Sequence, residues 1–271
     1  MSTLAARLHL RRSWLYAIGL LVLLFLNLPI LIIVPMSFSD ASFLQFPPQS
    51  WSLRWYEAFF SSQEWLTSAW ISLQAAIWTV LVAVPLGTLA AYAIDRTENM
   101  VGKAIRGLLM SPSIVPIVIV AIGTYFLLAQ FRLNNTMPGL VLAHTVLAMP
   151  FVIIAIGAGL ANFDVTLERA ARSLGASPVR TFLTVTMPNL RGSIATAALL
   201  AFLTSMDEVV VALFISSGPQ STLPRRMYAS MRDQVDPTIA AISTMLIAVV
   251  LVLVAAMSVL GSRNKKTTLE N

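Results

Sequence analysis

Two adjacent carboxylates, Asp207 and Glu208, are the residues whose position in this sequence most clearly calls for a chemical role. They lie about thirteen residues into an otherwise uncharged apolar run. A carboxylate at the middle of a membrane costs about 2.5–3.5 kcal/mol, so it normally faces a cavity or a partner. Neighbouring helical positions point about 100° apart. One acid can therefore face a solute path, where it would attract a cation, and the other a neighbouring helix. A structural hydrogen-bonded pair against another span is the alternative.

A second pattern lies between Glu168 and Pro188, where the chain reads ERAARSLGASPVRTFLTVTMP. Its small and apolar residues recur at helical spacing and predict a short amphipathic helix. They are Leu167, Ala170, Ala171 and Leu174.

Three residues predict how this segment turns. Gly175 is suited to end the first helix in the left-handed conformation. Ser177 and Pro178 are suited to the N-cap and first position of a second short helix, which we expect to run to about Val185 and end before Pro188. Two short helices joined at a sharp turn would form a rigid knob, and its small residues would let another protein approach closely. An amphipathic helix lying at the membrane interface is the alternative interpretation.

Other chemistry is sparsely represented in the chain. It has no cysteine, which excludes disulfides and cysteine-ligated metals. His144 is expected to be a buried, hydrogen-bonded histidine. No glycine-rich phosphate loop ending in Gly-Lys-Ser/Thr occurs, so we expect no ATPase site in this chain. We find no catalytic constellation and predict no catalytic residue, no metal site and no enzyme.

The elements that must position these residues are membrane helices. The chain has 271 residues, of which 57% are hydrophobic and 11% charged, and a soluble domain carries about 25% charged residues. A membrane-spanning helix needs about 20 apolar residues. We predict an all-α membrane protein whose six transmembrane helices cover residues 14–36, 69–94, 108–129, 139–161, 194–215 and 239–260. Pro112 and Pro116 lie near the start of the third of these spans, and prolines within the spans are expected to kink them.

Basic residues predict the orientation of these spans. Of the 18 lysines and arginines, 13 fall in the tail of residues 1–13, in the loops after the second and fourth spans, and in the C-terminal tail. Cytoplasmic segments carry such an excess. Both termini and the loop of residues 162–189 are therefore expected in the cytoplasm, and the loop of residues 37–68 outside. Arg11 and Arg12 before the first span also resemble a cleavable signal, but no Ala-x-Ala site follows, so we expect an uncleaved helix.

The loop of residues 162–189 resembles the EAA signature of ABC import permeases. The matching residues are Ala170, Ala171, Gly175, Val185 and Pro188, at the spacing of that motif. The resemblance implies a type I ABC importer permease fold with its core domain at residues 66–260. It also implies a cytoplasmic coupling helix that docks on an ATPase subunit, with Glu168, Ala170, Ala171, Gly175 and Pro188 as the coupling residues. Arg169 stands where that family usually has glutamate.

A second stretch resembles the C-type permeases of spermidine and putrescine importers. It comprises residues 205–209, 217–219, 222–224 and 236–237. The resemblance implies that the chain moves polyamines or a related small solute across the bacterial inner membrane, with Asp207 and Glu208 on the solute path. The implied partners are a second, paralogous permease subunit, two ATPase subunits that bind the ATP, an external solute-binding protein and membrane lipid. No cofactor in this chain and no nucleic acid partner is implied.

Two other function classes are compatible with parts of the pattern. An ion-coupled secondary transporter would use Asp207 and Glu208 as ion sites, but it would need no knob of the kind predicted at residues 168–188. A membrane-embedded enzyme would need a nucleophile–base or metal constellation near one membrane face.

Overall fold

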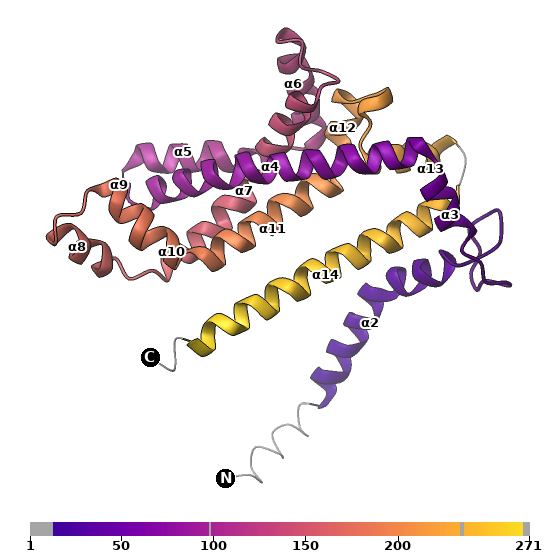
Figure 1. Cartoon of the computed structure of the whole chain (residues 1–271), viewed down its shortest axis with the longest axis horizontal. Helices are drawn as coiled ribbons and strands as arrows, with labels where there is room; N and C mark the ends of the chain where they lie inside the picture. The colour runs from indigo at the N-terminus through magenta and orange to yellow at the C-terminus, as the bar shows by residue number, and fades with distance from the viewer. Residues whose placement is uncertain (1–12, 98, 234–235, 268–271) are drawn as a thin grey trace. The chain divides into compact units, whose positions relative to one another are not determined.

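A computed structural model describes residues 13–97, 99–233 and 236–267, which fold as two compact units (Figure 1). The first unit comprises residues 1–61 and 233–248, and the second comprises residues 62–232 and 249–271. The described residues are predominantly helical and form no strand, with a single isolated bridge between Ser39 and Trp51. The all-α prediction is therefore confirmed. The basic residues of the predicted N-terminal tail lie outside the described residues.

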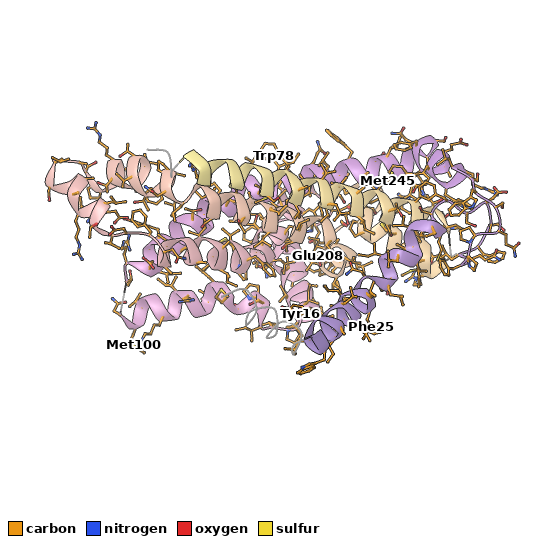
Figure 2. The ribbon with its side chains drawn as sticks, turned by 90° about the horizontal axis from the view of Figure 1, so that it is seen from below. Tyr16, Phe25, Trp78, Met100, Glu208 and Met245 are labelled. Atoms are coloured by element: carbon orange, nitrogen blue, oxygen red, sulfur yellow. The ribbon has the colours of Figure 1, made fainter. Side chains whose placement is uncertain are left out.

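The first unit contains the most apolar helix of the chain. Helix α2 (Ser13–Met36) includes a 23-residue segment, Trp14–Met36, with a mean hydropathy of 2.9 and no buried residue. Phe25, labelled in Figure 2, is 70% exposed. A helix that is apolar on every side is suited to lipid contact. It covers the predicted span of residues 14–36.

The segment after α2 is held together by aromatic and polar contacts. The Tyr56 hydroxyl, on helix α3 (Arg54–Ser61), lies 2.8 Å from Ser37 Oγ, and its ring lies 5.2 Å from the Phe38 ring. The Trp55 indole N–H donates to the Ala41 carbonyl at 3.2 Å. This loop therefore has local structure of its own.

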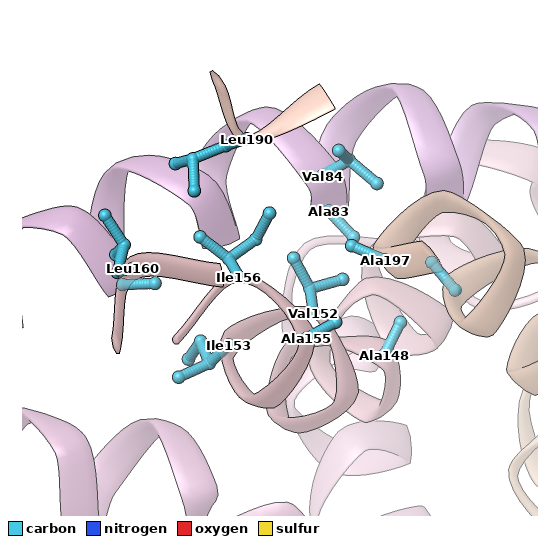
Figure 3. Close-up of a cluster of buried hydrophobic side chains, with 12 residues drawn as sticks. Ala83, Val84, Ala148, Val152, Ile153, Ala155, Ile156, Leu160, Leu190 and Ala197 are labelled. Atoms are coloured by element: carbon cyan, nitrogen blue, oxygen red, sulfur yellow. The ribbon is translucent and has the colours of Figure 1, made fainter. Parts of the chain in front are cut away.

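The centre of the second unit is a bundle of three helices. Helices α4 (Gln63–Asp95), α7 (Met137–Ala161) and α11 (Arg191–Asp207) pack along one another (Figure 1). Half of the buried residues in their shared core are alanines, among them Ala83, Ala148 and Ala197, which are fully buried (Figure 3).

Two glycines of this bundle sit where larger residues would collide with a neighbour. A Cβ on Gly87 would lie 2.4 Å from a methyl carbon of Val152, and one on Gly159 would lie 2.2 Å from Ser193 Oγ. Small residues allow helices to approach closely in a membrane, where van der Waals packing supplies much of the association energy.

The third predicted span, residues 108–129, is not one straight helix. Helix α5 (Met100–Met110) continues into a 3₁₀ turn (Ser111–Ser113), and helix α6 (Ile117–Gln130) then leaves at 102° to it. Pro112 and Pro116 lie at this break. Proline removes a helical hydrogen bond and disfavours helical geometry in the residue before it. The prolines therefore turn the chain sharply, where we expected only a kink.

The fifth predicted span, residues 194–215, is interrupted as well. Helix α11 ends at Asp207, Glu208 is extended (φ −73°, ψ 118°), and helix α12 (Val210–Ile215) begins two residues later. Helix α12 packs against α6. The interruption lies beside the two acids that the sequence singled out.

The chain ends in a short turn and two further helices. A 3₁₀ turn (Gly218–Gln220) precedes α13 (Leu223–Asp233), which is anchored to α4. The Leu223 N–H donates to Ser72 Oγ at 2.7 Å, and the Arg226 guanidinium contacts Ser68 and Glu64. Helix α14 (Thr238–Thr267) covers the sixth predicted span.

Four single helices of the described residues are long and apolar enough to cross a membrane. They are α2, α4, α7 and the Thr238–Ser258 part of α14, and the bent pair of α5 and α6 makes a fifth candidate. The pair of α11 and α12 covers the remaining predicted span, but α11 has 17 residues and α12 has six. Six spans therefore remain a prediction.

Candidate functional site

A knob of short helices occupies residues 166–190, at one end of the α4–α7–α11 bundle (Figure 1). Its first helix is α8 (Thr166–Ser173). Gly175 follows with φ +87°, and the N–H groups of Gly175 and Ala176 donate to the carbonyls of Arg172 and Ala171. This is the Schellman arrangement that a glycine after a helix allows. The predicted stop at Gly175 is confirmed.

The second half of the knob begins as the sequence predicts. Ser177 caps helix α9 (Pro178–Thr181), and its hydroxyl accepts the Arg180 N–H at 3.3 Å. The expected end before Pro188 is wrong, because a π-helical turn (Phe182–Thr186) leads directly into helix α10 (Met187–Asn189). Proline has no N–H to donate within a helix. The wider turn carries the chain past Pro188 without a break.

Several large apolar residues of the knob are exposed. Leu174 is 90% exposed, Val179 69% and Leu183 53%. Ala170, Gly175 and Pro188 are also exposed, and Ala171 is half-buried. Exposed large apolar side chains are suited to bury surface against a partner protein when they form a contiguous patch. Four of the five predicted coupling residues therefore lie at or beside an accessible surface.

Glu168, the fifth predicted coupling residue, points the other way. It is 3% exposed. Its Oε1 accepts hydrogen bonds from Arg96 Nη2 at 2.9 Å and Thr186 Oγ1 at 2.7 Å, and Oε2 accepts from the Tyr92 hydroxyl at 3.4 Å. Burial acts to raise the pKa of this carboxyl. The hydrogen bonds from Thr186 and Arg96 and the Arg96 charge outweigh it, so the pKa lies below its ordinary value.

The acid pair at the break between α11 and α12 divides into an exposed and a buried residue. Asp207 ends α11 and is exposed, whereas Glu208 is 6% exposed. Glu208 Oε1 accepts the Val211 N–H at 2.8 Å, and Oε2 accepts the Ala212 N–H at 2.9 Å. Both oxygens thus bind the first turn of α12, whose N–H groups have no partner within the helix.

A buried histidine completes this site from α7. His144 is fully buried, and its Nδ1 lies 2.7 Å from Ser205 Oγ on α11. Its Nε2 lies 3.9 Å from Glu208 Oε2 and has no hydrogen-bond partner. The expectation of a buried, hydrogen-bonded His144 is confirmed. Glu208 lies among the helices in Figure 2. The residues of the described chain contain no group of three or more histidine, aspartate or glutamate side chains that could hold a metal ion.

Residues 83–266 match the protein family described as "Binding-protein-dependent transport system inner membrane component". This range contains the knob, the acid pair, all of α7 and α11, and the last part of α4. The chain belongs to that family. The permease is thus a membrane transport subunit, as the resemblance in its EAA-like loop implied.

Curated relatives cover nearly the whole permease. The chain is 30% identical over 247 residues to the putrescine transport system permease protein PotI of Escherichia coli K12, covering 89% of this chain and 88% of that protein. It is 28% identical over 260 residues to the spermidine/putrescine transport system permease protein PotC of Haemophilus influenzae, covering 96% and 99%.

Solved structures share the fold of the permease. A bacterial alginate ABC transporter, in complex with an alginate pentasaccharide-bound periplasmic protein, contains a chain that superposes with a TM-score of 0.73. The alignment covers 96% of this chain and 98% of that chain at 18% identity. This likeness shows that the permease has the fold of an ABC importer membrane subunit.

Sequence reasoning missed the residues that hold the two acids in place. Arg96 was counted only as a basic residue of a cytoplasmic loop, and Thr186 and Tyr92 carried no assignment. Ser205 was noted only as part of a resemblance. Arg96 and Glu168 are 72 residues apart. A basic residue at the end of one predicted span and an acid in a later loop on the same side are compatible with such a pair, but their spacing does not specify it.

Proposed function

We propose that the permease moves polyamines such as putrescine and spermidine, or a closely related cationic solute, across the bacterial inner membrane. The observation that carries the proposal is the exposed carboxylate of Asp207 at the break between α11 and α12. An exposed carboxylate at a break between two apolar helices lowers the barrier for a cation that passes it. The similarity to putrescine and spermidine permeases supports the same class of solute.

The energy for transport comes from ATP bound and hydrolysed by a separate subunit. The exposed apolar residues of the knob, Leu174, Val179 and Leu183, contact that subunit. Arg169 is also exposed, on α8. The complete importer contains a second, paralogous permease, two ATPase subunits and an external solute-binding protein. Membership in the binding-protein-dependent family argues against the ion-coupled transporter.

In the proposed topology, both termini and the knob lie in the cytoplasm. The basic residues support it, since 13 of 18 fall in segments assigned to that side. Two reporters fused to the C-terminus test this orientation. A reporter enzyme that functions only in the cytoplasm should show activity, and one that functions only outside the membrane should show none. The opposite result would reverse the assignment of the knob.

Uptake of labelled putrescine and spermidine tests the solute. Cells that lack their own polyamine uptake should gain it with the complete importer. Unlabelled putrescine, which is 1,4-diaminobutane, should compete for uptake. The diol 1,4-butanediol has the same carbon chain without the charges and should not compete. Absence of uptake, or equal competition by the diol, refutes a cationic solute.

The role of Asp207 is tested in the same cells. Asp207→Asn should reduce uptake per assembled complex at least about tenfold, the effect of losing one charge-assisted contact. Asp207→Glu is the matched control, since it keeps the charge and should retain most of the uptake. Near-normal uptake by Asp207→Asn removes this residue from the solute path.

A further inference from the structure

Glu168 connects three elements that are separate in the sequence. It belongs to α8, while Thr186 closes the π-helical turn and Arg96 follows the last residue of α4. All three meet at the Glu168 carboxylate, at 2.7 Å from Thr186 and 2.9 Å from Arg96. Hydrogen bonds of this type, with one or both partners charged, are the stronger ones in proteins.

Aromatic rings enclose the same contact. The Arg96 guanidinium lies 5.1 Å from the centre of the Tyr92 ring, and that ring lies 4.8 Å from the ring of Phe182 in the π-helical turn. Arg96 also pairs with Asp95 at 2.6 Å. The Arg96 side chain is therefore fixed on several sides, and its position is set by α4.

The main packing partners of α8 are neighbouring parts of the knob. It packs on α9 and on the π-helical turn. Among the described residues, the pair of Glu168 and Arg96 is the one ion pair that joins the knob to a helix long enough to span a membrane. A displacement of α8 can therefore be transmitted to the end of α4 through this ion pair.

We propose that Glu168 is a positioning residue that makes the knob and the end of α4 move as one body, while the neighbouring exposed residues meet the ATPase. The proposal rests on the assignment of the knob as the ATPase-docking element. It divides the predicted coupling residues into two groups. Glu168 is buried and transmits displacement, whereas Ala170, Gly175 and Pro188 are exposed. A direct contact between Glu168 and another subunit would require its three hydrogen bonds to break.

The chain contains no cysteine, so two spin labels can be placed without background from it. Ala93→Cys at the end of α4 and Ser173→Cys on α8 are both exposed sites. In the assembled importer, with any partner cysteines replaced, the distance between the labels should be the same with and without ATP. In Glu168→Gln the distance should shift or broaden when ATP binds. This readout does not depend on which solute is carried.

Coupling between hydrolysis and transport gives the second readout, measured in proteoliposomes. Glu168→Gln should leave the ATPase co-purified and active but raise the ATP consumed per solute about tenfold, because a charge-assisted contact is lost. Arg106→Gln is the control, because it removes the charge of an exposed residue of α5 outside the knob, and it should leave that ratio unchanged. Arg96→Gln and the double variant should match Glu168→Gln rather than multiply its effect, since partners in one contact are not additive.

Several results would overturn the proposal. One is a Glu168→Gln importer whose label-to-label distance and ATP consumed per solute equal those of the wild type. Another is a double variant whose ATP consumption per solute is the product of the two single effects. If the ATPase no longer co-purified with the Glu168→Gln permease, Glu168 would be assigned to direct contact with the ATPase. Should that variant fail to accumulate, Thr186→Val removes one hydrogen bond at similar volume and should raise the coupling ratio in the same direction. If the wild-type importer carries no polyamine, the proposed solute fails, while the label distances still decide the role of Glu168.

Discussion

The two acids at the break in α11 and α12 should respond in opposite ways to removal of their charge. Glu208→Gln leaves one carbonyl oxygen for two backbone N–H groups, those of Val211 and Ala212, and places an amide NH₂ against one of them. Both N–H groups belong to buried residues. A buried donor left without an acceptor costs about 1–3 kcal/mol. Asp207 is exposed, so Asp207→Asn should change stability by less than about 0.5 kcal/mol.

Two measurements on the purified, assembled importer separate these effects. The apparent unfolding temperature of Glu208→Gln should fall by several degrees, since about 1 kcal/mol shifts a domain of this size by about 2–4 °C. Its uptake per assembled complex should remain close to wild type. Asp207→Asn should show the reverse pattern, with an unchanged unfolding temperature and reduced uptake. A stable Glu208→Gln variant with lost uptake would place Glu208 on the solute path and refute the structural role derived from its hydrogen bonds.

Three further perturbations have defined outcomes. Gly175→Val should cost about 1–2 kcal/mol from its positive φ alone, since no neighbour crowds the site, and should reduce co-purification of the ATPase. Gly159→Ala should lower the unfolding temperature, whereas Gly157→Ala, two residues away with open space around it, should not. Because the pKa of Glu168 lies below its ordinary 4.5, the stability that depends on it should be constant above about pH 5. It should be lost as the pH falls from about 4.5 through that lower pKa, and Glu168→Gln should abolish this loss.

The local features of the knob were predictable because single residues determine them. Gly175 adopts the left-handed conformation and Ser177 caps the next helix, as their chemistry requires. The long apolar helices were predictable for a similar reason, since hydropathy over about 20 residues needs no knowledge of neighbours.

The breaks within the third and fifth predicted spans depend on contacts with other parts of the fold. Pro112 and Pro116 predicted a kink, but a 102° turn depends on what α6 packs against, which is α12. No proline or glycine marks the break at Glu208. It is stabilised by the Glu208 carboxylate, which accepts the N–H groups of Val211 and Ala212, and the sequence shows only two acids there. Contacts between residues far apart in the chain, such as Arg96 with Glu168, depend on the whole fold.

The alanine-rich contact surface of α4, α7 and α11 has a thermodynamic consequence. Side chains of alanine have no rotamers to lose when they are buried, so packing them costs no side-chain conformational entropy. Between helices in lipid, the hydrophobic effect supplies little driving force, because the surroundings are as apolar as the contact. The association of these helices therefore depends on dispersion contacts at short range, and its enthalpy falls steeply with any separation of the backbones. The central bundle is consequently ordered at low entropic cost, and it is intolerant of added volume.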